Sequence, residues 1–96
     1  MMILVTYDVN TETKQGANRL RKIAKKCQNY GQRVQNSVFE CYLDAGQYHK
    51  FKNELISMID NETDNLRFYQ LGNKYQSKIE SFGNDISYDP EESLII

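Results

Sequence analysis

The chain has 96 residues, of which 40% are hydrophobic, 26% charged and 11% aromatic, and its formal net charge is −1. These values are typical of one globular domain, and they exclude a disordered chain, a collagen-like repeat and a coiled coil. Two cysteines are too few for a disulfide scaffold, and no apolar run approaches the roughly 20 residues of a membrane span, so we expect a cytoplasmic protein without membrane contact.

Strand and helix patterns alternate along the first half of the chain. Residues 2–9 carry apolar side chains at both odd and even positions, which predicts a central strand covered on both faces. Residues 16–30 place apolar side chains at helical spacing, with most of the bases off that stripe. Residues 32–35 and 38–43 are predicted to form two short strands joined by a tight turn.

The second half repeats this order. Residues 45–60 are predicted to form a second amphipathic helix and residues 66–71 a fourth strand. Residues 77–82 are a possible fifth strand, and residues 94–96 are predicted to pair at a sheet edge. The order β-α-β-β-α-β predicts an α+β fold, a ferredoxin-like sandwich with both helices on one face of an antiparallel sheet.

We therefore expect a ferredoxin-like domain over residues 1–82 and a C-terminal segment with an edge strand over residues 83–96. Apolar residues on both faces of the first strand indicate that the sheet face away from the helices is also covered. The simplest cover is the same face of a second copy, which predicts a homodimer through the sheet face.

The charges divide unevenly along the chain. Residues 1–35 carry seven bases and two acids, a charge of +5, whereas residues 36–96 carry five bases and eleven acids, a charge of −6. This asymmetry indicates a face for an anionic polymer, with a solvated helix face as the alternative. Arg19, Arg21 and Arg33 offer planar guanidinium groups to phosphate, unless they are solvated or paired with the acidic half.

Asp8 lies at the end of the predicted central strand, where an unpaired buried charge is costly. It either caps the turn into the first helix or pairs with an arginine, or it binds magnesium. One carboxylate is a poor site for a cation that takes about six oxygen ligands. A metal site therefore needs the Asp8 of a second copy near a two-fold axis, where the ion would activate water or hold a phosphoryl group.

Other chemically active residues are isolated. His49, the single histidine, has no serine, aspartate or cysteine constellation near it in the sequence, so a catalytic triad is excluded and a surface position is expected. Cys27 falls on the apolar stripe of the first helix and is predicted to be core. Tyrosines stack on bases in some nucleic-acid interfaces, but packing already explains Tyr7 and Tyr30.

Four segments together are similar to one known family. They are Tyr7-Asp8-Val9, Arg19-Leu20-Arg21, the run from Gly31 to Cys41 that contains Ser-Val-Phe-Glu, and the run from Leu66 to Gly72. This combination resembles the Cas-two family, the small CRISPR-associated nuclease of the adaptation module, in the form found with bacterial type I systems. The resemblance covers essentially the whole chain.

The resemblance implies a ferredoxin-like homodimer in which the C-terminal strand docks on the partner subunit. It implies an endonuclease for single-stranded RNA, double-stranded DNA or both, dependent on Mg²⁺ or, alternatively, Mn²⁺. It also implies a complex with integrase dimers along DNA during spacer acquisition. By matching position, Asp8 is implied to be the metal ligand and a catalytic residue, and Tyr7 to be catalytic. The residues implied to contact nucleic acid are Arg19, Arg21, Arg33 and Phe39.

Other functions remain open at this point. A non-catalytic adaptor would bind DNA and bridge integrase dimers without needing cleavage. A ribonuclease toxin of related fold would arrest growth on expression alone, and a small-molecule sensor of this fold would need a ligand pocket.

Overall fold

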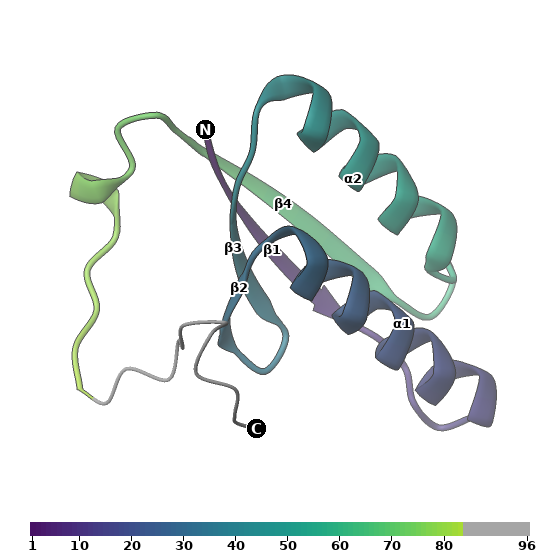
Figure 1. The fold of residues 1–96 in the computed structure, drawn as a ribbon. Helices are drawn as coiled ribbons and strands as arrows, with labels where there is room; N and C mark the ends of the chain where they lie inside the picture. Colours follow the sequence, from purple (N-terminus) through teal and green to yellow (C-terminus); the bar gives the residue numbers. More distant parts are fainter. Residues whose placement is uncertain (84–96) are drawn as a thin grey trace.

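The computed structural model describes residues 1–83. Its elements are β1 (Met2–Asp8), α1 (Lys14–Tyr30), β2 (Gln32–Gln35), β3 (Val38–Tyr42), α2 (Ala45–Met58), β4 (Asn65–Gly72) and a final 3₁₀ turn, η1 (Gln76–Lys78). This is the predicted βαββαβ order. Figure 1 shows α1 and α2 side by side on one face of the sheet. Neither helix is long and apolar enough to cross a membrane within the described residues.

The four strands form one antiparallel sheet in the order β2-β3-β1-β4. β1 is an interior strand, with Val5 opposite Phe39 in β3 and opposite Phe68 in β4. Because side chains alternate along a strand, Ile3, Val5 and Tyr7 share the face that the helices cover, and all three are buried. The predicted α+β, ferredoxin-like sandwich is confirmed.

Side-chain caps define where both helices begin. Thr13 precedes α1, and its hydroxyl accepts a hydrogen bond from the Gly16 amide at 3.0 Å. Asp44 precedes α2 and forms a capping box with Gln47, in which each side chain accepts a hydrogen bond from the backbone amide of the other residue. These caps satisfy amides that the first helical turn leaves unpaired.

The core lies between the helices and the sheet. Its largest fully buried side chains are Ile3, Val5, Ile23, Cys27, Phe39, Cys41, Phe51 and Leu55. The Phe51 ring contacts the rings of Tyr30 and Phe68, with centroids 4.5 and 6.3 Å apart. The cysteines are free thiols, and burial raises the pKa of each to about 12. The predicted core position of Cys27 is therefore confirmed.

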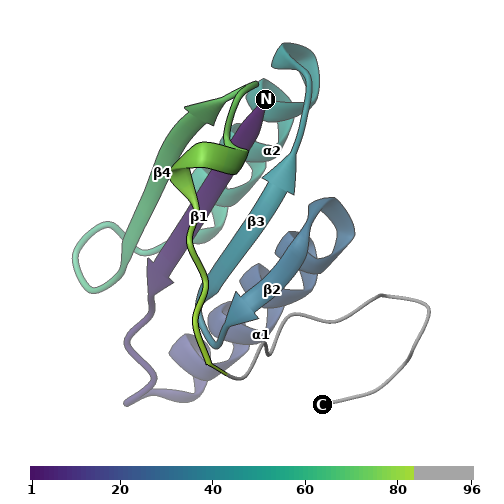
Figure 2. The same ribbon diagram turned by 90° about the vertical axis from the view of Figure 1, so that its left-hand side faces the viewer.

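The predicted fifth strand over residues 77–82 is wrong. The chain instead forms η1 and then runs without strand structure to residue 83, across the sheet face opposite the helices (Figure 2). The Tyr75 ring packs on Tyr42 of β3, with centroids 5.6 Å apart, and Lys78 Nζ donates to the Leu71 carbonyl at 3.0 Å. A further strand would have to pair with a free edge of the sheet. The Tyr75 and Lys78 contacts instead hold this segment over the sheet face. The predicted edge strand at 94–96 lies outside the described residues.

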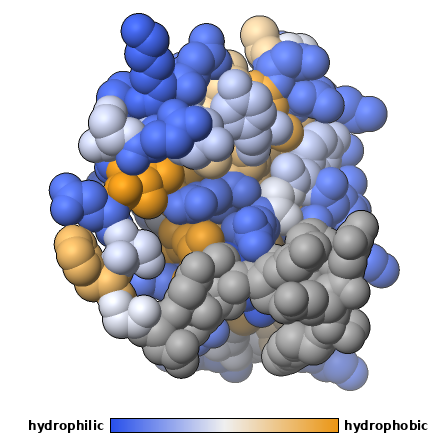
Figure 3. All heavy atoms as spheres, turned by 60° about the vertical axis from the view of Figure 1, so that its left-hand side comes forward, coloured by the Kyte–Doolittle hydropathy of each residue, from blue (hydrophilic) through white to orange (hydrophobic). Residues whose placement is uncertain are grey.

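The sheet face opposite the helices, called the open face below, mixes apolar and polar side chains. On β1 it carries Leu4 and Thr6, both half-buried, and it ends at the exposed Asp8. Tyr42 and Tyr69 are largely exposed on β3 and β4. Figure 3 shows this side of the molecule, where hydrophobic patches lie between hydrophilic ones. Cover by a second copy remains a prediction.

Candidate functional site

Asp8 is the last residue of β1 and lies opposite Asn65 of β4. It is exposed, and its carboxylate has no hydrogen-bond or ion-pair partner among residues 1–83. It neither caps α1, since Thr13 does so, nor pairs with an arginine, since Arg19 pairs elsewhere. The two structural explanations for an aspartate at this position therefore do not apply, and the carboxylate is free to bind a ligand.

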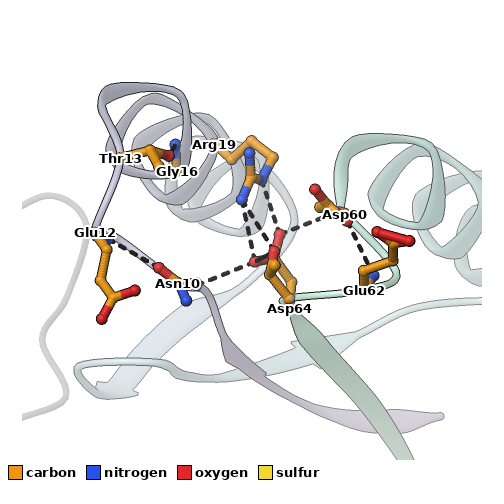
Figure 4. A network of polar contacts seen from close by, with 9 residues as sticks. Asn10, Glu12, Thr13, Gly16, Arg19, Asp60, Glu62 and Asp64 are labelled. Carbon is orange, nitrogen blue, oxygen red and sulfur yellow. Dashed lines mark hydrogen bonds and ion pairs between the residues drawn. The ribbon is translucent and has the colours of Figure 1, made fainter.

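Arg19 pairs with Asp64, in the loop before β4 (Figure 4). The Asp64 carboxylate accepts hydrogen bonds from Arg19 Nε at 2.8 Å and Nη2 at 3.3 Å, and from the amides of Asn10 at 3.1 Å and Asp60 at 2.9 Å. Its side chain is fully buried. The Arg19 guanidinium, followed by the two amides, holds the pKa of Asp64 well below its usual range.

Asp64 was not among the site residues predicted from the sequence. Its position directly before a strand, in a polar loop of the acidic half of the chain, is the feature that could have marked it as a partner for a base. Through the Asn10 amide, Asp64 fixes the turn that follows Asp8. The Asn10 side chain in turn accepts a hydrogen bond from the Glu12 amide at 2.9 Å. The backbone beside Asp8 is therefore anchored to both α1 and the β4 loop.

Tyr7 lies on the opposite face of the sheet from Asp8, beneath α1, with 5% of its surface exposed. Its ring stacks with Phe39 at 6.2 Å, and the Arg33 guanidinium lies 5.2 Å from the centre of the Phe39 ring. Burial raises the pKa of Tyr7 to about 12, although the nearby Arg33 opposes the shift. The phenol therefore keeps its proton at neutral pH.

The structure brings some of the predicted site residues together and separates others. Tyr7, Arg33 and Phe39 form one contact group, and Arg21 lines the same hollow. Arg19 lies in its ion pair with Asp64, and Phe39 is fully buried. Contact of any of these residues with nucleic acid stays a prediction.

Helix α1 presents a basic surface. It contains no acidic residue. Four of its bases are exposed: Lys14, Arg21, Lys22 and Lys25. Exposed bases of this kind fit either a helix face that contacts only solvent or a surface that binds an anionic polymer.

No group of three or more histidine, cysteine, aspartate or glutamate side chains that could hold a metal ion occurs in the described part of the chain. His49 is exposed on α2, as expected. Within residues 1–83, the Asp64 carboxylate near this end of β1 is already paired with Arg19, so the carboxylate left for a metal ion there is that of Asp8.

Fold and site together define a small ferredoxin-like α+β protein in which the carboxylate at the end of the central strand has no partner within residues 1–83. Residues 1–79 match the model of a family described as CRISPR associated protein Cas2. The chain is 57% identical over 95 residues to the CRISPR-associated endonuclease Cas2 of Halalkalibacterium halodurans, with 99% of each chain covered. It therefore belongs to the Cas2 family.

Two further similarities agree with this assignment. The CRISPR-associated endoribonuclease Cas2 of Nitratidesulfovibrio vulgaris is 52% identical over 96 residues, which cover 100% of this chain and 94% of that relative. The crystal structure of Streptococcus pyogenes Cas2 at pH 6.5 superposes with a TM-score of 0.75 at 54% identity and covers 86% of this chain and 100% of that one.

Proposed function

We propose that the protein is a metal-dependent endonuclease that hydrolyses phosphodiester bonds in single-stranded RNA, duplex DNA or both, and acts with the CRISPR integrase in spacer acquisition. The names of the relatives support a nuclease role, since one is called an endonuclease and the other an endoribonuclease. The observation that carries the proposal is the exposed carboxylate of Asp8 at the end of the central strand, which no side chain in the described part of the protein pairs with.

Asp8 is the residue that would hold Mg²⁺ or Mn²⁺. Magnesium is commonly held by one or two carboxylates and keeps several waters, so two Asp8 side chains from two copies fit its needs better than one. When bound, the ion supplies a Lewis acid and a water of lowered pKa for attack on phosphorus. The anchoring of Asn10 by Asp64 keeps the Asp8 backbone in place for this role.

The chain's own residues would also bind and orient the substrate. The exposed bases of α1 bind phosphate oxygens without reading sequence, as an endonuclease with little sequence preference requires. Tyr7 keeps its proton and lies buried on the opposite face of the sheet from Asp8, so its proposed part is to hold the end of β1 in position beneath α1 rather than to touch the reacting atoms.

A cleavage assay tests this proposal. Wild type, Asp8→Ala and the control Glu12→Ala, an exposed acid in the following loop, are incubated with labelled single-stranded RNA and with linear duplex DNA, in Mg²⁺, Mn²⁺ or EDTA. We expect metal-dependent cutting that falls by at least about two orders of magnitude in Asp8→Ala and is unchanged in Glu12→Ala. Undiminished cutting by Asp8→Ala would contradict the proposal.

The exposed bases of α1 favour one second candidate, a DNA-binding adaptor that bridges integrase dimers and needs no cleavage. For the adaptor, Asp8→Ala supports spacer acquisition in cells lacking the native protein, whereas the double variant Arg21→Glu, Lys25→Glu does not. Arg19 is unsuitable for this test because its reversal would break the ion pair with Asp64. Loss of acquisition in Asp8→Ala would contradict the adaptor and support the endonuclease.

A further inference from the structure

A hollow of about 360 Å³ lies between α1 and the turn that joins β2 to β3. Small-molecule pockets hold roughly 300–1,000 Å³, so the volume suits a small ligand. Its polar lining comes from Tyr7, Arg21, Arg33, Asn36 and Ser37, and no acidic residue of the described range 1–83 lines it. Because Tyr7 and Asp8 alternate along β1, the sheet separates this hollow from the Asp8 carboxylate.

Two polar atoms of this lining are buried without a hydrogen-bond partner in the described structure: Tyr7 Oη and Arg33 Nε. Buried polar groups nearly always have a partner, because an unmade hydrogen bond costs the full desolvation of the group. Arg33 Nε can only donate, whereas the Tyr7 phenol both donates and accepts, and Arg33 lies close enough to Tyr7 to lower the pKa of the phenol by hydrogen bonding. Even with Tyr7 Oη accepting from Arg33, the Tyr7 proton lacks an acceptor, and a ligand in the hollow would supply one.

The lining is held in position before any ligand arrives. The Arg33 guanidinium lies over the Phe39 ring. This contact helps to position the guanidinium group, whose N–H groups point outward in its plane toward acceptors. The Tyr7 amide donates to the Ser37 carbonyl at 3.2 Å, which ties the turn to β1. The donors therefore need little rearrangement to bind.

We propose that this hollow binds a phosphomonoester, either a free nucleotide or the terminal phosphate of a nucleic-acid strand. Two guanidinium groups, with no carboxylate from the described residues in the lining, favour an oxyanion. A phosphomonoester presents three oxygens at one end and reaches buried donors end on, whereas an internal phosphodiester carries a sugar on both sides. The site uses neither Asp8 nor a metal ion, so it is independent of the proposed cleavage.

Calorimetric titration of the wild-type chain in EDTA tests the site, since no metal-dependent cleavage occurs there. The probes are adenosine 5′-monophosphate, adenosine, and one DNA decamer with a 5′-phosphate or a 5′-hydroxyl. We expect saturable binding of the monophosphate, with adenosine at least about ten-fold weaker. A phosphorylated decamer that binds more tightly than the hydroxyl form identifies a strand end; binding of the nucleotide alone identifies a free nucleotide. Equal affinity for adenosine and its monophosphate would overturn the proposal.

Two variants locate the binding. Tyr7→Phe should weaken the monophosphate about ten-fold without lowering the unfolding midpoint, because the hydroxyl that it removes forms no well-aligned hydrogen bond within residues 1–83. Arg33→Gln should weaken it further. Arg67→Gln, a change of an exposed arginine on the open face, is the control and should keep its affinity within about two-fold.

Unchanged affinity in Tyr7→Phe, or an equal loss in Arg67→Gln, would show general charge attraction and overturn the site. If Arg33→Gln does not fold, Tyr7→Phe alone decides, since phenylalanine keeps the ring contact with Phe39.

Discussion

Asp64, rather than Asp8, supplies the carboxylate that neutralises Arg19 of α1. The two aspartates are hard to tell apart in the sequence, since one ends a strand and the other directly precedes one. Which of them pairs depends on the loops that meet in the fold, because the β1–α1 and α2–β4 loops converge on Asp64. Among residues 1–83, Asp8 is left without a partner, which is what a ligand-binding carboxylate requires.

The Arg19–Asp64 pair predicts a pH-dependent stability. A carboxyl whose folded pKa lies below its unfolded value stabilises the fold above the unfolded pKa of about 4, and this stability is lost as the pH falls toward the folded pKa. Asp64→Asn should lower the unfolding midpoint at pH 7 by about 5–10 °C, and the difference from wild type should shrink below about pH 4. Thermal unfolding followed from pH 2 to 7 measures this.

Glu62→Gln is the control for that series, because Glu62 is an exposed acid in the same loop whose side chain makes no contact within residues 1–83. The unfolding midpoint of Glu62→Gln should equal that of the wild type at every pH. A difference between Asp64→Asn and wild type that persists unchanged at pH 2 would contradict the assignment of the stability to this carboxylate.

At the scale of elements, α1 approaches the β1–α1 loop so closely that only glycine fits at Gly16. A Cβ there would fall against the Asn10 carbonyl oxygen and carbon, which are backbone atoms and cannot rotate away. Gly46, in the first turn of α2, has open space around it, its nearest neighbour being Asp44 Oδ1 at 3.5 Å. Gly16 and Gly46 therefore allow the same substitution to be compared at a helical position with a steric clash and at one without.

Gly16→Ala should lower the free energy of unfolding by about 2–3 kcal/mol, because α1 must move away from the loop. Gly46→Ala should leave it unchanged or raise it by about 0.5 kcal/mol, since alanine is the better helix former. Urea denaturation of both variants measures the change. Equal effects of the two substitutions would mean that helix propensity, rather than the close approach, sets the stability.

The elements themselves were largely predictable from periodicity. Every predicted helix and strand from residue 2 to residue 71 is present, and its ends agree with the structure to within two residues. The segment over residues 77–82 was not predictable, because its two apolar residues, Ile79 and Phe82, are compatible with either a strand or a face-covering segment. The Tyr75–Tyr42 contact decides between them, and a local pattern does not contain it.

For the whole molecule, the βαββαβ order was enough to predict an antiparallel sheet with both helices on one face, and the structure adds the strand order β2-β3-β1-β4. The hollow beside Tyr7 was not predictable, because it depends on where α1 lies relative to the β2–β3 turn. The motif Tyr7-Asp8 looks like one site in the sequence, yet the pleat of β1 places the two side chains on opposite faces.

Among residues 1–83, Asp64 is held in its ion pair with Arg19 and Asp8 is the free carboxylate at the end of β1, so the proposed metal site predicts a dependence on two copies. Wild type and Asp8→Ala are unfolded together in equal amounts, refolded and assayed for cleavage. If both Asp8 side chains are needed, activity should be about one quarter of an equal total amount of wild type, since only wild-type pairs are active. Activity of about one half would contradict a site that is shared between two copies. As a control, wild type mixed with Glu12→Ala should have the full activity of an equal total amount of wild type.

The register of β1 is held near both ends. Close to its start, the Leu43 amide donates to the Met1 carbonyl at 2.9 Å, and just beyond its end the Asn10 amide donates to Asp64. A shift by one residue would exchange the two faces of the strand and bring the Asp8 carboxylate beneath α1 while exposing the phenol of Tyr7. Substitutions along β1 alter one face at a time, whereas a single inserted or deleted residue in this strand would destroy both sites at once.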